Sequence, residues 1–540
     1  MHFQNSDEVL HARHLYLSLF AENKEIPLIR DLSFSLTAGQ TIALVGASGA
    51  GKSALIKCIL RFNTARFPFK IKGNLLFGPH STNLDLVTAS IEEFNDARSK
   101  HIAWIAQDSF FALNPAYTCK QHLEEALIFP FSTSTLYSRS EALGLLDAVG
   151  LPTNTGFYNS YPHQISGGQA QRLQIACALA KKPHLLFADE PVSSLDPISR
   201  NEILALLKKL AIQRGMGIFM VSHDLDSVRY YSDEIIVLEH GAVVEQGSAQ
   251  SILDRPKSTY GKTLLRTKQN SLKQNHPKKH NNPHPVLSVK NLSFTYRRNE
   301  SNIKHKTQKI AALNALSFDV YEGEILGIVG TSGSGKSTLA RCLAGLATPS
   351  SGKVIHAFND LIEQGIKKQH PIQLIFQDAA AALNPFQNIE KCLQEALYHT
   401  KTGLTSKQLE SLISELLFRV GLSNDLKKRM PHQISGGQRQ RFCIARSLCF
   451  SPKLMLFDEA LSALDILSQL DLLKLIRSLN EEKNLPIIFI SHDIQAVRNI
   501  SDRIAVLSEG KIIETNTPEE LIHNPQQEYT RKLIDASFLS

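Results

Sequence analysis

Short apolar segments alternate with amphipathic ones along this chain, and each apolar segment ends in glycine or in polar residues. TIALVG at 41–46 and ILGIVG at 325–330 indicate buried strands, and each leads through a Gly-rich turn into a segment typical of a helix, at 52–60 and 336–344. Further apolar strands ending in Asp-Glu or Ser-His-Asp lie at 184–190, 453–459, 218–224 and 487–493. This alternation predicts a parallel sheet with helices on both faces and its chemistry at the carboxyl ends of the strands.

The whole pattern occurs twice. The octet PHQISGGQ stands at 162–169 and again at 431–438. The two Gly-rich loops are 284 residues apart, whereas Gln107 and Gln377 are 270 apart, so the first copy carries 14 extra residues between its loop and its glutamine. We expect these extra residues to form a surface loop. A period of this length indicates duplicated domains and not a solenoid.

A linker with its own composition separates the two copies. Residues 266–285 (RTKQNSLKQNHPKKHNNPHP) carry five Lys or Arg and no acid, with Pro, Asn and Gln between them, which is typical of a solvated connecting segment. This stretch supplies most of the net charge of +8. Together with the basic segment 297–309 it is all that favours a nucleic-acid surface, and the lack of aromatic residues in both favours solvated loops instead. We predict a first domain at 1–265, the linker at 266–285 and a second domain at 286–540.

Composition narrows the class of protein further. Hydrophobic residues at 43% and charged residues at 20% are typical of folded domains. No apolar run approaches the about 18 residues that a membrane-spanning helix needs. The N-terminus lacks the basic start, the apolar run and the cleavage site of a signal peptide, so we expect none. Seven scattered cysteines without a CxxC pair favour a reducing compartment and no metal module.

Each Gly-rich turn has the pattern Gly-x-x-x-x-Gly-Lys-Ser between a strand and a helix. The backbone N–H groups of such a turn converge on phosphates, and the helix start adds positive potential. Lys52 and Lys336 are expected to reach the β- and γ-phosphates, and the hydroxyls of Ser53 and Ser337 to bind Mg²⁺. The alternative is an ordinary turn closed by a surface lysine, and it would have to occur twice.

Adjacent acids end one strand in each copy, at Asp189-Glu190 and at Asp458-Glu459. We expect the aspartate to orient Mg²⁺, directly or through water, and the glutamate to take a proton from the attacking water. Such a pair could instead cap a helix, with no catalytic part. The phosphate loops and the Ser-His-Asp motifs around the acids favour the catalytic interpretation.

With these motifs the chain resembles the ATP-binding-cassette (ABC) ATPases over nearly its whole length. ISGGQ within the octet is similar to the signature motif of that family and precedes a predicted helix in each copy. The resemblance implies an α/β fold of two tandem P-loop ABC-type nucleotide-binding domains, each with a mainly parallel sheet core, an antiparallel β part and a helical subdomain. It also implies two ATP molecules enclosed head to tail between the two domains. The implied cross-pairs are Ser435 and Gly437 with the loop of Lys52, and Ser166 and Gly168 with the loop of Lys336.

The same resemblance assigns the other site residues by their place in the motifs. The implied catalytic residues are Glu190, Glu459, the switch histidines His223 and His492, and the glutamines Gln107 and Gln377 that sense Mg²⁺ and water. The implied nucleotide-binding residues are Gly46, Ser48, Gly49, Gly51, Lys52, Ser53, Gly330, Ser332, Gly333, Gly335, Lys336, Ser337, Thr338, Ser166, Gly168, Gln169, Ser435, Gly437, Gln438 and Tyr296. The implied Mg²⁺ ligands are Ser53, Gln107, Asp189, Ser337, Gln377 and Asp458.

Two positions depart from the family pattern. Tyr296 suits the aromatic residue that stacks on adenine, but the first copy has Leu19 there, with Phe20 next to it. Ala460 stands where a proline usually follows the catalytic glutamate. Because both copies keep every catalytic residue type, we expect two active sites, and adenine stacking in the first site stays open.

A finer resemblance points to the peptide/nickel importer subfamily. ALNP at 112–115 and 382–385 is similar to a motif of that subfamily, and so are the tails at 255–265 and 524–534, in which Pro stands four residues before Tyr. The resemblance extends to the branch with both ATPases in one chain, which includes dipeptide/oligopeptide, microcin C and glutathione importers.

The resemblance therefore implies an ATPase that couples ATP hydrolysis, with Mg²⁺, to the import of peptides or peptide-like compounds. It implies two integral-membrane permease subunits as partners, an indirect extracytoplasmic solute-binding protein, no nucleic acid, and a place at the cytoplasmic face of the inner (cell) membrane. A sugar importer is one alternative, and ALNP and the tails speak against it. A soluble double-cassette ATPase acting on ribosomes or nucleic acid is the other, and the short linker and the lack of CxxC pairs speak against it.

Overall fold

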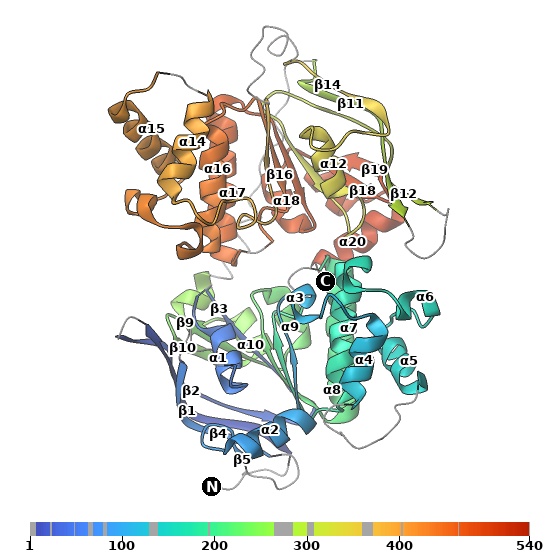
Figure 1. The fold of residues 1–540 in the computed structure, drawn as a ribbon, viewed down its shortest axis with the longest axis vertical. Coiled ribbons are helices and arrows are strands. Elements are labelled where there is room, and N and C mark those ends of the chain that lie inside the picture. Colours follow the sequence, from blue (N-terminus) through green and yellow to red (C-terminus); the bar gives the residue numbers. More distant parts are fainter. Residues whose placement is uncertain are drawn as a thin grey trace. The chain divides into compact units, whose positions relative to one another are not determined.

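The computed structural model of the protein forms two compact units, which are described separately. It describes residues 7–21, 24–47, 49–62, 69–78, 84–128, 139–192, 195–263, 284–299, 307–358, 371–400, 403–462 and 464–538. Unit 1 comprises residues 1–195 and 199–268, and unit 2 comprises residues 196–198 and 269–540 (Figure 1). Most of the linker at 266–285 lies outside the described residues, so the predicted domain bounds stay a prediction.

Unit 1 is built on one ten-stranded sheet. Its strands are β1 (Glu8–Ala21), β2 (Lys24–Thr37), β3 (Thr41–Gly46), β4 (Phe69–Phe77), β5 (Leu84–Asp85), β6 (Ile102–Ile105), β7 (Leu185–Asp189), β8 (Gly217–Val221), β9 (Glu234–Glu239) and β10 (Ala242–Ser248). They lie in the order β5-β4-β1-β2-β10-β9-β3-β8-β7-β6. The five from β9 to β6 run parallel, whereas β1, β2, β4 and β5 pair antiparallel.

Unit 2 repeats this plan with two sheets. Its strands are β11 (Leu287–Asn299), β12 (Thr307–Val320), β13 (Ile325–Val329), β14 (Ser351–His356), β15 (Ile372–Ile375), β16 (Leu454–Asp458), β17 (Ile487–Ser491), β18 (Arg503–Ser508) and β19 (Lys511–Asn516). The larger sheet has the order β15-β16-β17-β13-β18-β19, parallel except for β19, and the smaller antiparallel sheet has the order β12-β11-β14.

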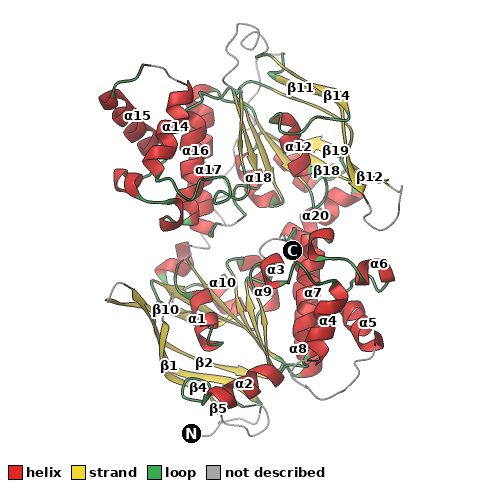
Figure 2. Cartoon of the chain, in the orientation of Figure 1, coloured by secondary structure: helices red, strands yellow, loops and turns green. Residues whose placement is uncertain are grey.

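The helices follow the strands as the alternating pattern predicts. In unit 1 they are α1 (Lys52–Ile59), α2 (Ile91–Lys100), α3 (Ser109–Ala112), α4 (Cys119–Ile128), α5 (Arg139–Ala148), α6 (Thr155–Tyr158), α7 (Gly167–Ala180), α8 (Pro197–Arg214), α9 (Leu225–Tyr231) and α10 (Ala249–Asp254). In unit 2 they are α12 (Lys336–Leu343), α14 (Ile389–Thr400), α15 (Ser406–Arg419), α16 (Gly436–Leu448), α17 (Ile466–Lys483), α18 (Ile494–Ile500), α19 (Pro518–His523) and α20 (Glu528–Phe538). In each unit a group of helices lies at the end opposite the antiparallel strands (Figure 2).

The central parallel strands are buried on both faces, which explains their uninterrupted apolar sequences. In β13, Ile325 and Val329 belong to one core cluster of unit 2, whereas Leu326 and Ile328 belong to another. Because successive side chains of a strand point to opposite faces, the two clusters lie on the two sides of the sheet. The predicted fold, a mainly parallel sheet covered on both sides, with an antiparallel part and a helical part, is confirmed.

The predicted surface loop of 14 extra residues stays a prediction, because residues 359–370 of the corresponding segment in unit 2 lie outside the described residues. In unit 1, the segment between β4 and β6 forms the short strand β5 and the ten-residue helix α2. Ser90 caps α2 through a reciprocal capping box with Glu93, and Phe94 and Ala97 are its buried residues. A local start signal and two buried apolar residues therefore make α2 a packed element of unit 1.

Among the described residues, no helix is both long and apolar enough to cross a membrane. This agrees with the hydropathy of the sequence.

The core of unit 2 gives a test of its packing. Phe442 on α16 is fully buried. Phe442→Ala should lower the free energy of unfolding of unit 2 by about 3–5 kcal/mol, because the variant loses the burial of the ring and also leaves a cavity in the core. Hydrogen exchange in denaturant, followed separately in peptides of each unit, measures the change. The matched control is Phe418→Ala on α15, where the ring is 83% exposed and the expected loss is below about 0.5 kcal/mol. Equal losses in the two variants would contradict this packing.

Candidate functional site

The first phosphate loop connects the end of β3 to the start of α1. Gly51 holds a φ of 88° at the N-cap of α1, which a residue with a side chain adopts only at a cost. The Lys52 ammonium is buried and donates hydrogen bonds to the carbonyl oxygens of Gly46 and Ala47, both at 2.8 Å. The loop thus wraps around a buried cation. Gly49, with a φ of 80°, also belongs to this loop, whereas Ser48 lies outside the described residues.

The second phosphate loop has the same construction between β13 and α12. Lys336 donates to the carbonyl oxygens of Gly330 and Thr331, both at 2.9 Å. A Cβ atom on Gly330 would lie 2.3 Å from the backbone oxygen of Leu507, so only glycine fits at this close approach. The other predicted members of the loop are Ser332, Gly333 with a φ of 81°, and Gly335 with a φ of 107°. Both loops therefore have the geometry that the sequence predicts.

A hydroxyl and a carboxylate meet beside each loop. Ser53 donates to Oδ1 of Asp189 at 2.7 Å, and Ser337 donates to Oδ1 of Asp458 at 3.2 Å. Burial raises the pKa of both aspartates, and the hydrogen bond from the serine opposes that rise. A buried carboxylate next to a hydroxyl supplies the oxygen ligands that Mg²⁺ prefers, so the donor set fits this ion.

Glu190 follows β7 in a strained backbone conformation. Its φ is 48°, in the left-handed region that disfavours residues with a side chain, and Glu459 after β16 has the same feature with a φ of 49°. Each conformation costs about 1–3 kcal/mol, and such strain clusters at functional sites. The strain accompanies a specific set of contacts to the carboxylate.

In unit 1, two side chains from other segments converge on Glu190. Gln107, after β6, donates its amide to Oε2 of Glu190 at 2.9 Å. Nδ1 of His223, after β8, lies 3.3 Å from Oε1. Three separate strand ends therefore place glutamine, glutamate and histidine together, as expected where parallel strands end at one edge.

Unit 2 repeats the cluster. Gln377 donates to Oε2 of Glu459 at 3.1 Å, and Nδ1 of His492 lies 3.3 Å from the same oxygen. The ammonium of Lys336 lies 3.4 Å from Oε1 of Glu459, so the phosphate loop and the acid are directly linked.

The electrostatics of the cluster keep both glutamates ionised. Burial alone would raise the pKa of Glu459, but the hydrogen bonds and charges of His492 and Lys336 outweigh it and lower the pKa to about 2. The pKa of Glu190 is lowered for the same reasons, by His223 and Lys52 against burial. In turn, Glu190 raises the pKa of His223 against the effect of burial. Each site thus holds a carboxylate that stays charged at neutral pH.

The signature residues form a separate group at a helix start in each unit. Ser166 is the N-cap of α7, where its hydroxyl accepts from the Gln169 N–H and Gln169 returns a bond to the Ser166 N–H. Ser435 and Gln438 form the same capping box at α16. Gly168 and Gly437 lie in the first turns of these helices. Helix starts of this kind carry partial positive charge that suits a phosphate group.

The adenine-side positions differ between the units. The Tyr296 hydroxyl lies 3.1 Å from Oγ1 of Thr338, beside the second phosphate loop, and its ring is 42% exposed. In unit 1, Phe20 is 38% exposed and lies 6.0 Å from the Lys70 ammonium. Ala460 is buried directly after the strained Glu459. The Tyr296 hydroxyl therefore ties this aromatic side chain to the helix that follows the second phosphate loop.

Two supports of the site were missed from the sequence. Arg200 donates to Asp224 at 2.7 Å, and Asp224 helps to raise the pKa of the adjacent His223. The Tyr529 hydroxyl of α20 accepts from the Thr331 N–H at 2.9 Å and pairs with its Oγ1 at 2.9 Å. Tyr529 stood out in the sequence only as a subfamily marker, yet it holds the second phosphate loop.

Comparisons with known proteins agree with this geometry. A family model described as "ABC transporter" matches residues 29–193 and 313–462, one stretch in each unit. The chain is 34% identical to the "Glutathione import ATP-binding protein GsiA" of Escherichia coli strain K12, over 98% of this chain and 90% of that protein. The protein of the same name from Shigella flexneri serotype 5b is also 34% identical, with the same coverage.

Solved structures show the fold alone. The complex of archaeal ribosomal stalk protein aP1 and archaeal ribosome recycling factor aABCE1 matches with a TM-score of 0.60 and 19% identity, over 95% of this chain and 91% of that one. A model of ribosome-bound archaeal Pelota and ABCE1 matches with a TM-score of 0.61 and 19% identity, over 96% of this chain and 80% of that one. The motifs, the two repeated clusters and the family match in both units together establish that this chain belongs to the ABC transporter family, as an ATPase that carries the family's ATP-binding domain twice.

Proposed function

We propose that this ATPase drives an importer for peptides or peptide-like compounds. The observation that carries the proposal is the likeness over 98% of the chain to proteins named for glutathione import. Glutathione is a short peptide, so this likeness supports peptide-like cargo as a class. The ribosome-bound neighbours are only 19% identical and support nothing beyond the fold.

Hydrolysis at each site would use the residues that converge on the glutamate. Lys52 and the loop N–H groups bind the β- and γ-phosphates, and the α1 start adds positive potential. Glu190 stays ionised, so it can accept a hydrogen bond from the attacking water and orient it toward the γ-phosphorus. His223 pairs with Glu190 through Nδ1, which leaves Nε2 to donate to the γ-phosphate. Unit 2 would repeat these roles with Lys336, Glu459 and His492.

We assign Mg²⁺ to the serine–aspartate pair of each loop. Ser53 with Asp189, and Ser337 with Asp458, supply the hydroxyl and carboxylate oxygens, and Gln107 and Gln377 lie at the neighbouring glutamates. When bound, the ion would neutralise charge on the phosphates.

The two units would pair within the chain. Ser435 and Gly437 at the start of α16 would complete the site of Lys52, and Ser166 and Gly168 would complete that of Lys336. The support is that both helix starts are capped by an exposed serine and suit an anion. Because the two units are covalently linked, their pairing has a high effective concentration.

A groove in unit 2 suits the permease contact. A cavity of about 560 Å³ lies where α14 and α16 meet the segment after β15, and its lining includes Phe376, Ala382, Asn384 and Leu346. Phe376 directly precedes Gln377, and the Gln377 amide donates a hydrogen bond to Glu459. A protein segment bound in this groove would therefore be linked to the proposed catalytic acid through Gln377. We assign this groove to one of two integral-membrane permease subunits. The chain would then lie at the cytoplasmic face of the membrane, and an extracytoplasmic solute-binding protein would deliver the cargo.

The catalytic assignment is tested with Glu190→Gln and Glu459→Gln. Glutamine keeps the shape but not the charge, so the double variant should lose about 10²–10⁴-fold in ATP turnover and keep ATP binding. Each single variant should keep part of the turnover, since both sites are complete. Phosphate release and nucleotide binding are measured in parallel, with Glu415→Gln, an exposed acid on α15, as the control. Wild-type turnover in the double variant would refute the assignment.

Tyr529→Phe tests the support of the second loop. Loss of the hydroxyl removes the bond to the Thr331 N–H and should weaken ATP binding at the second site by about two- to tenfold. Equilibrium binding is measured in a Lys52→Ala background, so that the second site alone reports. Tyr398→Phe, at a 61% exposed tyrosine of α14, is the matched control and should leave the affinity unchanged. An unchanged affinity in Tyr529→Phe would show that the contact has no part in nucleotide binding.

The importer assignment is tested by affinity purification of the chain from detergent-treated source cells. We expect two multi-span permeases to copurify, identified by mass spectrometry. Leu346→Asp places a charge in the groove and should reduce recovery of one permease by about tenfold or more, whereas Phe418→Asp, outside the groove, should not. Recovery with ribosomes and no membrane protein would contradict the importer and favour the ribosome-associated alternative.

A further inference from the structure

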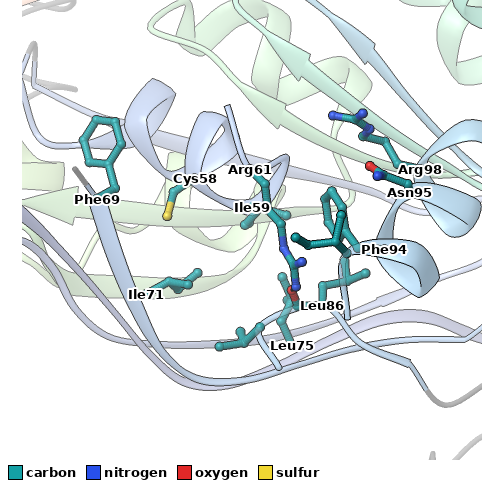
Figure 3. A pocket seen from close by; sticks show the side chains of 12 residues that line it. Cys58, Ile59, Arg61, Phe69, Ile71, Leu75, Leu86, Phe94, Asn95 and Arg98 are labelled. Carbon is teal, nitrogen blue, oxygen red and sulfur yellow. The ribbon is translucent and has the colours of Figure 1, made fainter. Parts of the chain in front are cut away.

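Unit 1 contains a cavity that the ATPase mechanism does not use. Its volume is about 550 Å³, and it lies between the end of α1, strand β4 and helix α2 (Figure 3). Binding sites for small molecules in proteins span about 300–1,000 Å³, so this one is large enough for a ligand.

The cavity has an apolar end and a cationic end. Phe69, Ile71 and Cys58 lie at one end of the view, and Arg98 and Asn95 lie at the other (Figure 3). The lining includes two arginines, Arg61 and Arg98, and no carboxylate. Among the described residues, neither guanidinium forms an ion pair with an acid. An uncompensated positive charge beside an apolar wall is complementary to an amphipathic anion.

Arg61 occupies its place at a conformational cost. Its φ is 54°, in the left-handed region, whereas the equivalent residue of unit 2, counted from the phosphate loops, is Gly345 with a φ of 70°. Arg61 crosses the cavity to donate to the carbonyl oxygens of Leu86 and Ala89, at 3.0 and 2.7 Å (Figure 3). Its Cζ lies 4.2 Å from the ring centre of Phe94. Arg61 therefore holds the wall of the cavity through these two hydrogen bonds.

Arg98 lies between two aromatic rings. Its Cζ is 5.8 Å from the ring centre of Phe94 and 5.9 Å from that of Phe62. The side chain is half-buried, so an anion that reaches it is partly shielded from water and bound more strongly than at an exposed arginine. The rings fix the guanidinium at the polar end of the cavity.

We propose that this cavity binds a small amphipathic carboxylate, with its carboxylate at Arg98 and Asn95 and its hydrocarbon body against Ile71, Phe69 and Cys58. The site goes beyond the proposed importer function. In the second unit Gly345 stands at the position of Arg61, so the guanidinium that holds the cavity wall belongs to the first unit. A zwitterionic peptide fits less well, since its ammonium group would find no acid in the lining.

The position of the cavity links it to the first ATP site. Cys58, Ile59 and Arg61 lie at or just beyond the end of α1, and the same helix begins at Lys52 of the phosphate loop. Eight helical residues span about 12 Å, so the ligand would sit one short helix away from the phosphates. Occupancy of the cavity would shift ATP affinity at the first site, and ATP would shift ligand affinity by the same factor.

The test is a titration of the purified full chain with decanoate. Trp104 is the only tryptophan of the chain, and its ring centre lies 5.0 Å from that of Phe62. Its fluorescence therefore reports on the polar end of the cavity, and calorimetry gives the number of sites. We expect saturable binding of one decanoate per chain, and no binding of decylammonium, which has the same hydrocarbon chain and the opposite charge.

Two variants and one control locate the site. Arg98→Gln should weaken decanoate binding about tenfold or more, through loss of a charged hydrogen bond. Ile71→Phe should block binding by filling the apolar end. Lys100→Gln removes the same charge from the same helix outside the cavity and should leave the affinity unchanged. The proposal is overturned if no saturable signal appears up to about 1 mM decanoate, if decylammonium binds as well, or if Arg98→Gln binds as wild type. None of these results depends on the cargo of the importer.

Discussion

The hydrogen bond from a glutamine amide to the glutamate proposed as catalytic base joins the sheet and the helical part of each unit. Gln107 bonds Glu190 at 2.9 Å, and Gln377 bonds Glu459 at 3.1 Å. Each glutamine stands between the parallel sheet, which holds the acid, and the helical part, which begins just after it in the chain. Any movement of the helical part that shifts the glutamine therefore changes the surroundings of the acid. We propose that this short contact makes ATP turnover and the helical surface depend on each other.

The burial of the parallel strands makes this contact possible. Strands covered on both faces can end together at one edge, where the polar residues that follow them meet around a small volume. The left-handed conformation of Glu190 and Glu459 directs each carboxylate into that volume, and the pairs with glutamine and histidine offset the strain. The low pKa of the acids follows from the same contacts, because a buried carboxylate stays charged only beside cationic partners.

Much of this could be predicted from the sequence. The apolar runs predicted the central strands, and the loop motif predicted a turn between strand and helix around Lys52 and around Lys336, as the structure has it. The part of the two lysines in phosphate binding stays a prediction. Convergence of Gln107, Glu190 and His223 also followed, because each stands at the end of a predicted strand. These predictions share one cause. The strands are short and apolar on both faces, and the polar residues of the site follow each strand directly in the sequence.

The remainder depends on contacts between distant segments, which no local pattern encodes. Tyr529 contacts Thr331, which lies 198 residues earlier in the chain, and this contact forms only when the C-terminal helix packs against unit 2. Helix α2 carries little periodic signal in the sequence, because its ten residues bury only Phe94 and Ala97. The cavity beside α2 arises from that helix packing over α1 and β4, so its residues have no motif. The residues next to Glu190 in the sequence likewise do not predict its left-handed φ.

The most direct test of the account compares ATP hydrolysis by the chain with and without its copurified permeases, in the wild type and in Gln107→Asn/Gln377→Asn. Asparagine is one methylene shorter and cannot maintain the bond to the glutamate. The account predicts that the permeases stimulate hydrolysis in the wild type and fail to do so in the variant, although the variant still binds ATP. Equal stimulation in both proteins would contradict the claim that this glutamine contact couples the ATP sites to the membrane partners.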